Sequence, residues 1–442
     1  MNRTLRLSLL ILLLGLCLPR SAWAIPAFAR RYETSCQTCH LAYPALTPFG
    51  EAFRWNGYRF PDKGDLTAEK RPPVELGNEA QKERWPKVVY PGAIPAEVPL
   101  SITLSGSAGY GMELEGHDHG AMAGMEASEM SEEGEHMGEV RLSSLVDMFG
   151  LRAAASLGDH FSVLTAVNLG GMSGVELERA SLTFQPLADP ARLRIKVGAF
   201  EPELHGISIH RGLVGHMLRL STATTGDTTW APEPTETGLE LSGVAHHRVG
   251  WVVGAVENVT PAVYMAKDAY VRGFWKLGGM PVDGSGATST SAAWRERSFT
   301  LGTSAYNGRE QLSDGARVQD DSFTRVGLDA HTIIEDLSLN LITIRQWNDK
   351  PYLGDRESTV TDRAFVELTY VIRPVFFPTA RFEASHEQKG ETDWTSPDWL
   401  GMLALSGVVR PNVLLRAQGA VGGEPGEATH FRFATLSYAA AF

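Results

Sequence analysis

Beyond residue 98 the chain consists of segments, each about ten residues long, in which apolar and polar side chains alternate. In one segment the two kinds of residue occupy opposite faces: Leu193, Ile195, Val197 and Ala199 on one, and Arg192, Arg194 and Lys196 on the other. The stretch from Thr379 to Ser385 alternates in the same way. A period of two predicts β-strands with one apolar and one polar face. A soluble β-protein would alternate too, so a second feature must separate it from a membrane barrel.

The lengths of the connections between strands supply that feature. Tight turns are expected at 158–159, 186–190, 246–249, 335–336, 374–377 and 410–411. Longer connections are expected between them, at 111–147, 201–236, 307–321, 346–361, 388–399 and 421–428. Outer-membrane barrels combine short periplasmic turns with longer outer loops in this manner. One connection, at 277–296, is long where a short turn is due.

The strands are expected to begin near residues 101, 148, 160, 175, 191, 237, 248, 267, 297, 322, 337, 361, 377, 400, 412 and 429. This even count returns both ends of the barrel to the periplasm. The chain ends in Phe442, with apolar residues at every second position before it, which resembles the signal read by the outer-membrane assembly machinery. The sequence therefore predicts an all-β transmembrane barrel of about 16 antiparallel strands over residues 98–442.

Charged residues on the polar faces of these strands are expected to line the lumen as solvated pore walls. They are Arg192, Arg194, Lys196, Glu367, Arg381, Glu383 and Arg416.

The N-terminus has the features of a secretory signal peptide. Arg3 and Arg6 precede an apolar run at 7–18, and Ala22-Trp23-Ala24 forms a small-residue cleavage site. Cleavage is expected after Ala24, so residues 1–24 direct export to the outer membrane. The formal net charge of −12 makes nucleic acid an unsuitable partner.

The mature chain keeps two cysteines, which occur in the motif Cys36-Gln37-Thr38-Cys39-His40. C-x-x-C-H is the attachment sequence for c-type haem. Both thiols form thioethers with the haem vinyl groups, and His40 supplies an axial imidazole to the iron. A redox dithiol would be expected in a βαβ context, and none is visible. A zinc site would need further ligands nearby, and residues 41–111 contain no His, Cys or Met. Cys36, Cys39 and His40 are therefore predicted to hold one covalently attached haem c.

Residues 25–97 are expected to be a small haem-binding cytochrome c-like segment that ends in a Pro-, Lys- and Glu-rich linker from 61 to 98. The stretch PAFARRYETSCQTCH…PALTPFGEAFRWNGYRF resembles the start of the fused monohaem cytochrome–porins of bacterial outer membranes, whose best-known members are iron oxidases. The matching residues are Phe28, Arg30, Cys36, Cys39, His40, Pro44, Leu46, Thr47, Phe49, Gly50, Phe53, Gly57 and Tyr58. The chain departs from that family at Tyr32-Glu33, where many members have Thr-Gly, and at Glu51, where they have a basic residue.

The resemblance implies an electron conduit through the outer membrane. An extracellular donor, in this family Fe(II), would give electrons to the haem, and a soluble periplasmic c-type cytochrome would accept them. The protein would then be an Fe(II):cytochrome c oxidoreductase or an electron-transfer protein. Two alternatives stay open: a conduit for another metal or acceptor, and a transport porin whose CxxCH is a disulfide or a metal clip.

Residues 112–139 form an acidic stretch rich in Met and His, which is expected to be an outer loop. Its candidate ligands are His117, His119, His136, Met112, Met122, Met125, Met130 and Met137. Such a loop could concentrate metal cations at the pore mouth, or it could be a solvated acidic loop without a ligand role.

The second axial ligand of the haem iron is not fixed by the sequence. Barrel residues His205, His210, His216 and Met217 are candidates, and a five-coordinate iron is the alternative.

Overall fold

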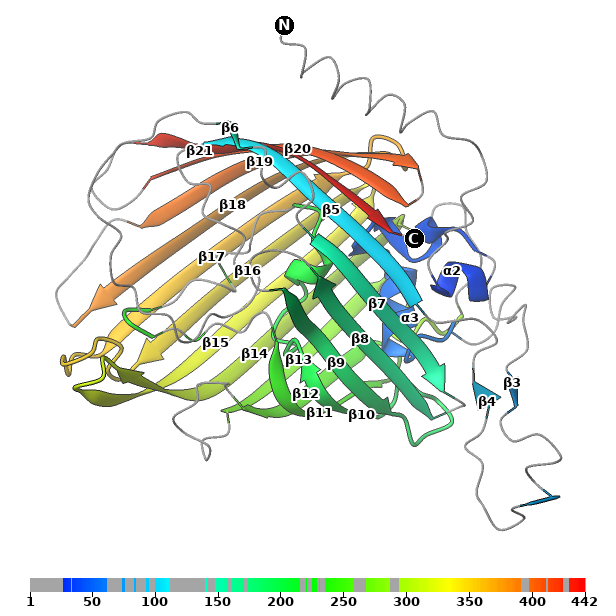
Figure 1. Cartoon of the computed structure of the whole chain (residues 1–442), viewed down its shortest axis with the longest axis horizontal. Helices are drawn as coiled ribbons and strands as arrows, with labels where there is room; N and C mark the ends of the chain where they lie inside the picture. The colour runs from blue at the N-terminus through cyan, green and yellow to red at the C-terminus, as the bar shows by residue number, and fades with distance from the viewer. Residues whose placement is uncertain are drawn as a thin grey trace, which may run out of the picture.

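The computed structural model contains one closed barrel with the N-terminal segment at one end (Figure 1). It describes residues 27–32, 34–61, 74–75, 83–84, 93–94, 100–111, 140–141, 148–157, 160–169, 174–214, 220, 225–228, 230, 235–257, 268–286, 294–390, 397–410, 412–423 and 429–441. The expected signal peptide, the acidic loop at 112–139, His216 and Met217 lie outside these residues. No helix within the described ranges is long and apolar enough to cross a membrane.

Sixteen long antiparallel strands form the barrel, together with the two-residue strand β6 (Val140–Arg141). They are β5 (Leu100–Gly111), β7 (Met148–Leu157), β8 (Phe161–Leu169), β9 (Val175–Phe184), β10 (Arg194–Phe200), β11 (Glu236–Ala245), β12 (Val249–Glu257), β13 (Asp268–Gly278), β14 (Glu296–Ser313), β15 (Val318–Glu335), β16 (Leu337–Asn348), β17 (Thr359–Tyr370), β18 (Phe376–Lys389), β19 (Asp398–Arg410), β20 (Val413–Gly423) and β21 (His430–Ala441). β21 pairs with β5, with Ala439 opposite Ser105, and this pairing closes the sheet. The predicted sixteen-strand antiparallel barrel is confirmed.

One expected loop is wrong. Residues 307–321 form the end of a long hairpin, because β14 continues to Ser313 and β15 begins at Val318. Each of these strands has 18 residues, whereas a membrane strand needs about 9–11. The hairpin tip therefore extends beyond the apolar zone. Its polar residues on both faces hide the strand pattern in the sequence.

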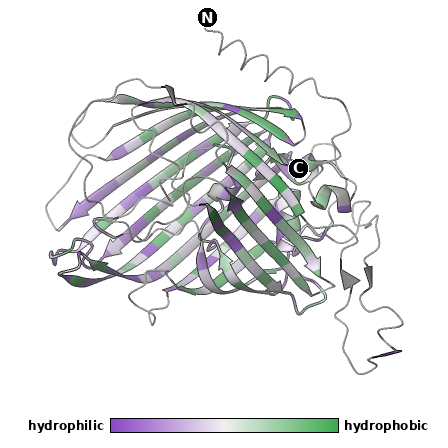
Figure 2. Ribbon diagram, viewed as in Figure 1, coloured by the Kyte–Doolittle hydropathy of each residue, from purple (hydrophilic) through white to green (hydrophobic). Residues whose placement is uncertain are grey.

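The two faces of the barrel wall have opposite chemistry. Along β17, Arg363, Glu367 and Thr369 are buried toward the lumen, while Val366 and Leu368 are exposed on the outside. Figure 2 shows hydrophobic and hydrophilic residues alternating along the strands. A water-soluble protein buries its apolar face, so this inverted arrangement fits a wall that faces lipid.

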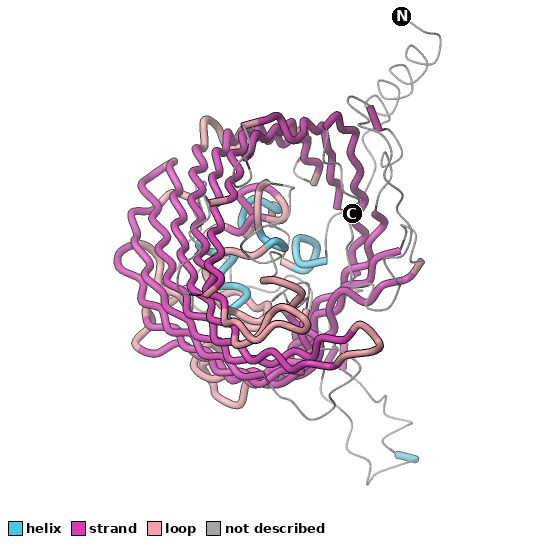
Figure 3. The backbone as a smooth tube through the Cα atoms, turned by 90° about the vertical axis from the view of Figure 1, so that its left-hand side faces the viewer, coloured by secondary structure: helices cyan, strands magenta, loops and turns pink. Residues whose placement is uncertain are grey.

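The N-terminal residues 27–32 and 34–61, called the lumen plug below, lie at one end of the barrel (Figure 1) and within the outline of the ring of strands when the barrel is viewed end-on (Figure 3). The plug contains α2 (Ala27–Arg31), the 3₁₀ turn η1 (Cys36–Thr38), the paired strands β1 (His40–Ala42) and β2 (Ala45–Leu46), and α3 (Pro48–Trp55). Residues 201–214, called the infolded segment, also fold into the lumen and contain the 3₁₀ turn η2 (Ile209–Arg211). In the expected linker, β3 (Val74–Glu75) pairs with β4 (Ala93–Ile94).

The plug and the infolded segment change the environment of the lumen charges. Lys196 pairs with Glu240 at 2.6 Å, and Arg381 pairs with Glu367 at 2.8 Å and lies 3.5 Å from Glu383. Arg194 is buried with its guanidinium 4.7 Å from the ring of Trp55 in α3. Solvated pore walls were therefore the wrong expectation for these residues. Arg192 is mostly exposed and Arg416 is half-buried.

The long connection at the short-turn end, between β13 and β14, contacts the plug. The side-chain amide of Asn56 donates a hydrogen bond to the carbonyl of Asp283 at 2.7 Å. A Cβ on Gly284 would meet Pro61 and Ala52, and this glycine has a φ of +71°. The exception to the turn pattern is thus a loop that covers the plug.

We expect Leu403→Arg to destabilise the barrel by roughly 2–4 kcal/mol in lipid, because Leu403 lies on the outer face of β19 and is 70% exposed. Urea unfolding in vesicles measures the effect. Val318→Arg, at the hairpin tip and 66% exposed, is the matched control and should cost less than about 1 kcal/mol. Equal, negligible effects at both positions would contradict a lipid-facing wall.

Candidate functional site

The sequence explains where helix α3 begins and which of its residues are buried. Thr47 is the N-cap, its side-chain oxygen accepts a hydrogen bond from the amide of Gly50 at 3.1 Å, and Pro48 occupies the first turn. Phe49 and Phe53 are buried in the aromatic cluster of the plug, and Trp55 is buried on another side of the helix in a cluster with barrel residues. An eight-residue helix has little stability alone, so these buried side chains hold it in place.

The start of α3 is attached to the CxxCH motif. The amide of Thr47 donates to the carbonyl of Cys39 at 2.9 Å, and its hydroxyl donates to the carbonyl of Thr38 at 3.0 Å. A Cβ on Gly50 would clash with the carbonyl of Cys39. The motif and the helix therefore move as one unit, and Gly50 is required at their contact.

An aromatic cluster supports this unit from the other side. Tyr32 stacks on Phe60 with ring centroids 3.9 Å apart, and Phe28 meets Phe53 edge-on at 4.8 Å. Phe49 and Tyr58 complete the cluster. It gives a segment too short for a large core its own apolar centre.

Cys36, Cys39 and His40 line one cavity, of about 290 Å³, between the plug and the barrel wall. Both cysteines are free thiols. The Nδ1 of His40 donates to the carbonyl of Pro44 at 3.3 Å, so Nε2 is the nitrogen that could coordinate a metal. Burial lowers the pKa of His40 below its ordinary value. A neutral imidazole is the form that coordinates iron.

The barrel side of this cavity is basic. Its cationic lining residues are Arg54, Arg152, Arg179, Arg194, Lys196 and Arg211. The Nε atoms of Arg179 and Arg194 are buried without a hydrogen-bond partner among the described residues. Buried polar atoms are rarely left unpaired, so these groups point to an anionic ligand. A haem c fits this donor set, with thiols and imidazole on the plug and N–H donors for its two propionates on the wall.

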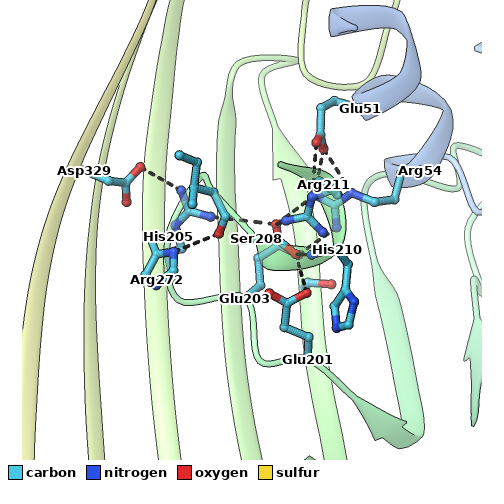
Figure 4. A network of polar contacts seen from close by, with 12 residues as sticks. Glu51, Arg54, Glu201, Glu203, His205, Ser208, His210, Arg211, Arg272 and Asp329 are labelled. Atoms are coloured by element: carbon cyan, nitrogen blue, oxygen red, sulfur yellow. Dashed lines mark hydrogen bonds and ion pairs between the residues drawn. The ribbon is translucent and has the colours of Figure 1, made fainter. Parts of the chain in front are cut away.

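A network of buried charges joins the plug to the barrel (Figure 4). Arg54 of α3 forms two 2.7 Å hydrogen bonds to the carboxylate of Glu203 in the infolded segment and also pairs with Glu51 at 2.9 Å. Arg211 lies 3.5 Å from Glu51 and 3.7 Å from Glu203. Arg272 on β13 lies 3.8 Å from Glu203. The network connects α3, the infolded segment and the wall.

The charges in this network keep each other ionised. Burial alone would raise the pKa of Glu203, but Arg54 and Arg211 hold that pKa well below its usual range. The pKa of Glu51 is lowered in the same way, against burial, by Arg54 and Arg211. Glu51, which departs from the pattern of the resembling family, is thus an ion-pair partner of Arg54 within the plug and of Arg211 in the infolded segment.

The candidate second ligands separate into two groups. His210 lines the cavity that holds Cys36, Cys39 and His40. His205 is not in that lining, and its Nδ1 donates to the carbonyl of Ile207 at 2.8 Å. His216, Met217 and the 112–139 loop lie outside the described residues. Within the described ranges, no group of three or more His, Cys, Asp or Glu residues is arranged to hold a metal ion.

Sequence reasoning missed the partners of the plug. The local sequence is that of ordinary loop or pore residues at Glu203, Arg211 and Arg194, and no pattern in it shows that α3 lies against them. The one signal was the length of the 201–236 connection.

Comparisons with known proteins find the fold and not the site. No family model matches the chain, and no curated protein matches it. Among solved structures, the outer membrane channel DcaP of Acinetobacter baumannii matches with a TM-score of 0.50 and 13% identity, over 78% of this chain and 96% of that one. OmpF of Salmonella typhi, in a complex with daunomycin, matches with a TM-score of 0.50 and 7% identity, over 78% and 97%.

At these identities the likeness concerns the fold alone. The chain is a closed sixteen-strand barrel of the outer-membrane porin type.

We expect Arg54→Ala to release α3, because it leaves Glu203 buried without its main partner at a cost of about 3 kcal/mol. Hydrogen exchange of the amides of residues 48–56 should become roughly 100-fold faster. Arg345→Ala is the matched control: Arg345 makes a two-bond pair with Asp362 that is largely exposed, so exchange in α3 should not change. Unchanged exchange in Arg54→Ala would show that the network does not hold the plug.

Docking of the plug should resist acid. A carboxylate whose pKa is lowered by folding stabilises the fold above its unfolded pKa of about 4.3 and loses that effect only as the pH falls through the folded value. The pKa of Glu203 lies well below the usual range. Exchange in α3, corrected for intrinsic rates, should therefore show about the same protection at pH 5 as at pH 7 and lose protection progressively below about pH 4, and undocking above pH 5 would contradict this expectation.

Proposed function

We propose that the chain is an outer-membrane monohaem cytochrome–porin that carries electrons from an extracellular donor to the periplasm. The proposal depends on one observation: Cys36, Cys39 and His40 line a single cavity inside the barrel, opposite arginine N–H groups that lack partners in the described structure. The sequence resemblance of residues 26–60 to that family agrees with this geometry.

The residues of the chain have separate tasks in this proposal. Cys36 and Cys39 provide the two thioether bonds, and His40 Nε2 provides an iron ligand. Arg179 and Arg194 offer N–H donors to the propionates. Haem c supplies a carrier for one electron when bound. The plug keeps this carrier at the end of the barrel where the C-terminus lies (Figure 1).

The outer membrane is the location that fits the surface of the barrel. Its outside is apolar along the strands, and its fold is that of outer-membrane channels. With both ends of the sheet in the periplasm, the plug lies at the periplasmic mouth, within reach of a soluble c-type cytochrome.

Fe(II) is the donor that we propose for the outer face. Each Fe(II) loses one electron and becomes Fe(III), and the periplasmic cytochrome takes up that electron. The oxidised metal, which is poorly soluble, stays outside. Another extracellular metal or acceptor would use the same route.

A solute-transport porin is the second candidate, and the fold comparisons favour it, because the matched structures include an outer membrane channel. Against it, the plug and the infolded segment occupy the lumen and bury charges that would line an open pore. In that case the CxxCH would serve as a disulfide or a metal clip.

A denaturing gel stained for haem peroxidase activity separates the two candidates, because only covalently bound haem survives denaturation. Protein from a host that attaches haem c should stain at its full-length position. The double variant Cys36→Ala/Cys39→Ala should lose the stain. Gln37→Ala, between the cysteines, should keep it. An unstained wild-type protein would leave the transport porin as the better reading.

Anaerobic titration with Fe(II) then tests the donor. The purified haem-bearing protein should be reduced in proportion to added Fe(II), with one electron taken per haem. A protein that stains for haem yet stays oxidised under excess Fe(II) would show that another donor or acceptor is used.

A further inference from the structure

One histidine of the infolded segment is held in an unusual position. His210 lies in η2, where the Ser208 side chain accepts a hydrogen bond from its amide at 3.1 Å. The Ser208 hydroxyl in turn donates to Glu201 at 2.6 Å. η2 is therefore fixed at its start, and Figure 4 shows the imidazole projecting away from the Arg211 side of the turn.

The two ring nitrogens of His210 have different surroundings. Nδ1 lies 3.3 Å from the carboxylate of Glu178 on β9. Nε2 is buried and has no hydrogen-bond partner among the described residues. Glu178 Oε1 also lies 2.9 Å from Arg179, and Oε2 pairs with Arg152 at 2.7 Å, so the contact of this carboxylate with Nδ1 is electrostatic. It positions the ring, and the buried Nε2, which has no partner among the described residues, is the nitrogen left to coordinate a metal.

His210 is one of two histidines that line the cavity of the CxxCH motif, and the other is His40. Plug residues 27–61 contain no second His and no Met. Three other charged residues of the lining are already engaged: Lys196 pairs with Glu240 at 2.6 Å, Glu203 is bound to Arg54, and Glu201 accepts a hydrogen bond from Ser208. Among the described lining residues, His210 is the one imidazole left for the second face of a haem.

We propose that His210, through Nε2, would supply a second imidazole to the iron of a haem held by Cys36, Cys39 and His40, and that Glu178 is its positioning residue. This inference rests on the proposed function, since it requires a haem on Cys36 and Cys39. A haem held by both histidines would link the plug to the barrel, because one ligand is residue 40 of the plug and the other belongs to the segment between β10 and β11. It also gives a site built for electron transfer, because an iron with two imidazoles has no open position for small molecules.

The test is the spectrum of the intact, haem-loaded barrel. Wild-type ferric protein should show a low-spin iron with two imidazoles by electron paramagnetic resonance and magnetic circular dichroism. His210→Ala should shift to high spin and return to low spin when imidazole is added. His205→Ala, on the same segment but outside the cavity lining, is the matched control and should keep the wild-type spectrum.

The opposing outcomes are separate from failure of the proposed function. A haem-stained wild-type protein that is high-spin, or a His210→Ala variant with an unchanged spectrum, would overturn His210 as ligand while the haem remains. A wild-type protein without covalent haem would overturn the proposed function itself and this inference with it. If His210→Ala does not assemble, as judged by heat-modifiable migration, His210→Met decides. A change to an imidazole–thioether signature supports the inference, and a persistent two-imidazole signature refutes it.

Discussion

The double hydrogen bond between Arg54 and Glu203 is the interaction on which the arrangement of the lumen depends. It joins α3, and through Thr47 the CxxCH motif, to a segment that lies 149 residues further along the chain. A buried pair of this kind adds little net stability compared with an apolar contact, but breaking it leaves a costly unpaired charge. Its effect is therefore to select one position of the plug over all others.

The barrel exposes apolar side chains on its outer face and buries charged side chains in its lumen, and each arrangement suits the medium on that side. Outside, apolar side chains such as Leu403 and Leu405 are exposed, because lipid is a better solvent for them than water. Inside, charged side chains are buried, and they persist because nearby strands of the wall supply their counter-charges, as in the pairs Lys196–Glu240, Arg272–Asp329 and Arg381–Glu367. An open pore would hydrate these charges, whereas this lumen pairs them.

The strands of the barrel wall and the CxxCH motif could be located from the sequence. The contacts between the wall and the N-terminal segment could not. Strand positions could be predicted because the period of two and the turn residues are local signals. The hairpin at 307–321 was missed because, beyond the apolar zone, both faces of a strand are polar. The motif of Cys36, Cys39 and His40 is also local. By contrast, the contacts of Arg54 with Glu203 and of Trp55 with Arg194 join residues that are far apart in the sequence. No local sequence pattern at either residue predicts its partner.

The enclosed position of residues 27–61 has a consequence for biogenesis. These residues are made before the wall that surrounds them, and Gln37 ends up bonded to the carbonyl of Pro374, 337 positions later. Contacts between such distant parts form late and slowly. Cys36 and Cys39 are half-buried in the finished barrel, so an enzyme that modifies these thiols would reach them more easily before the N-terminal segment docks against the wall.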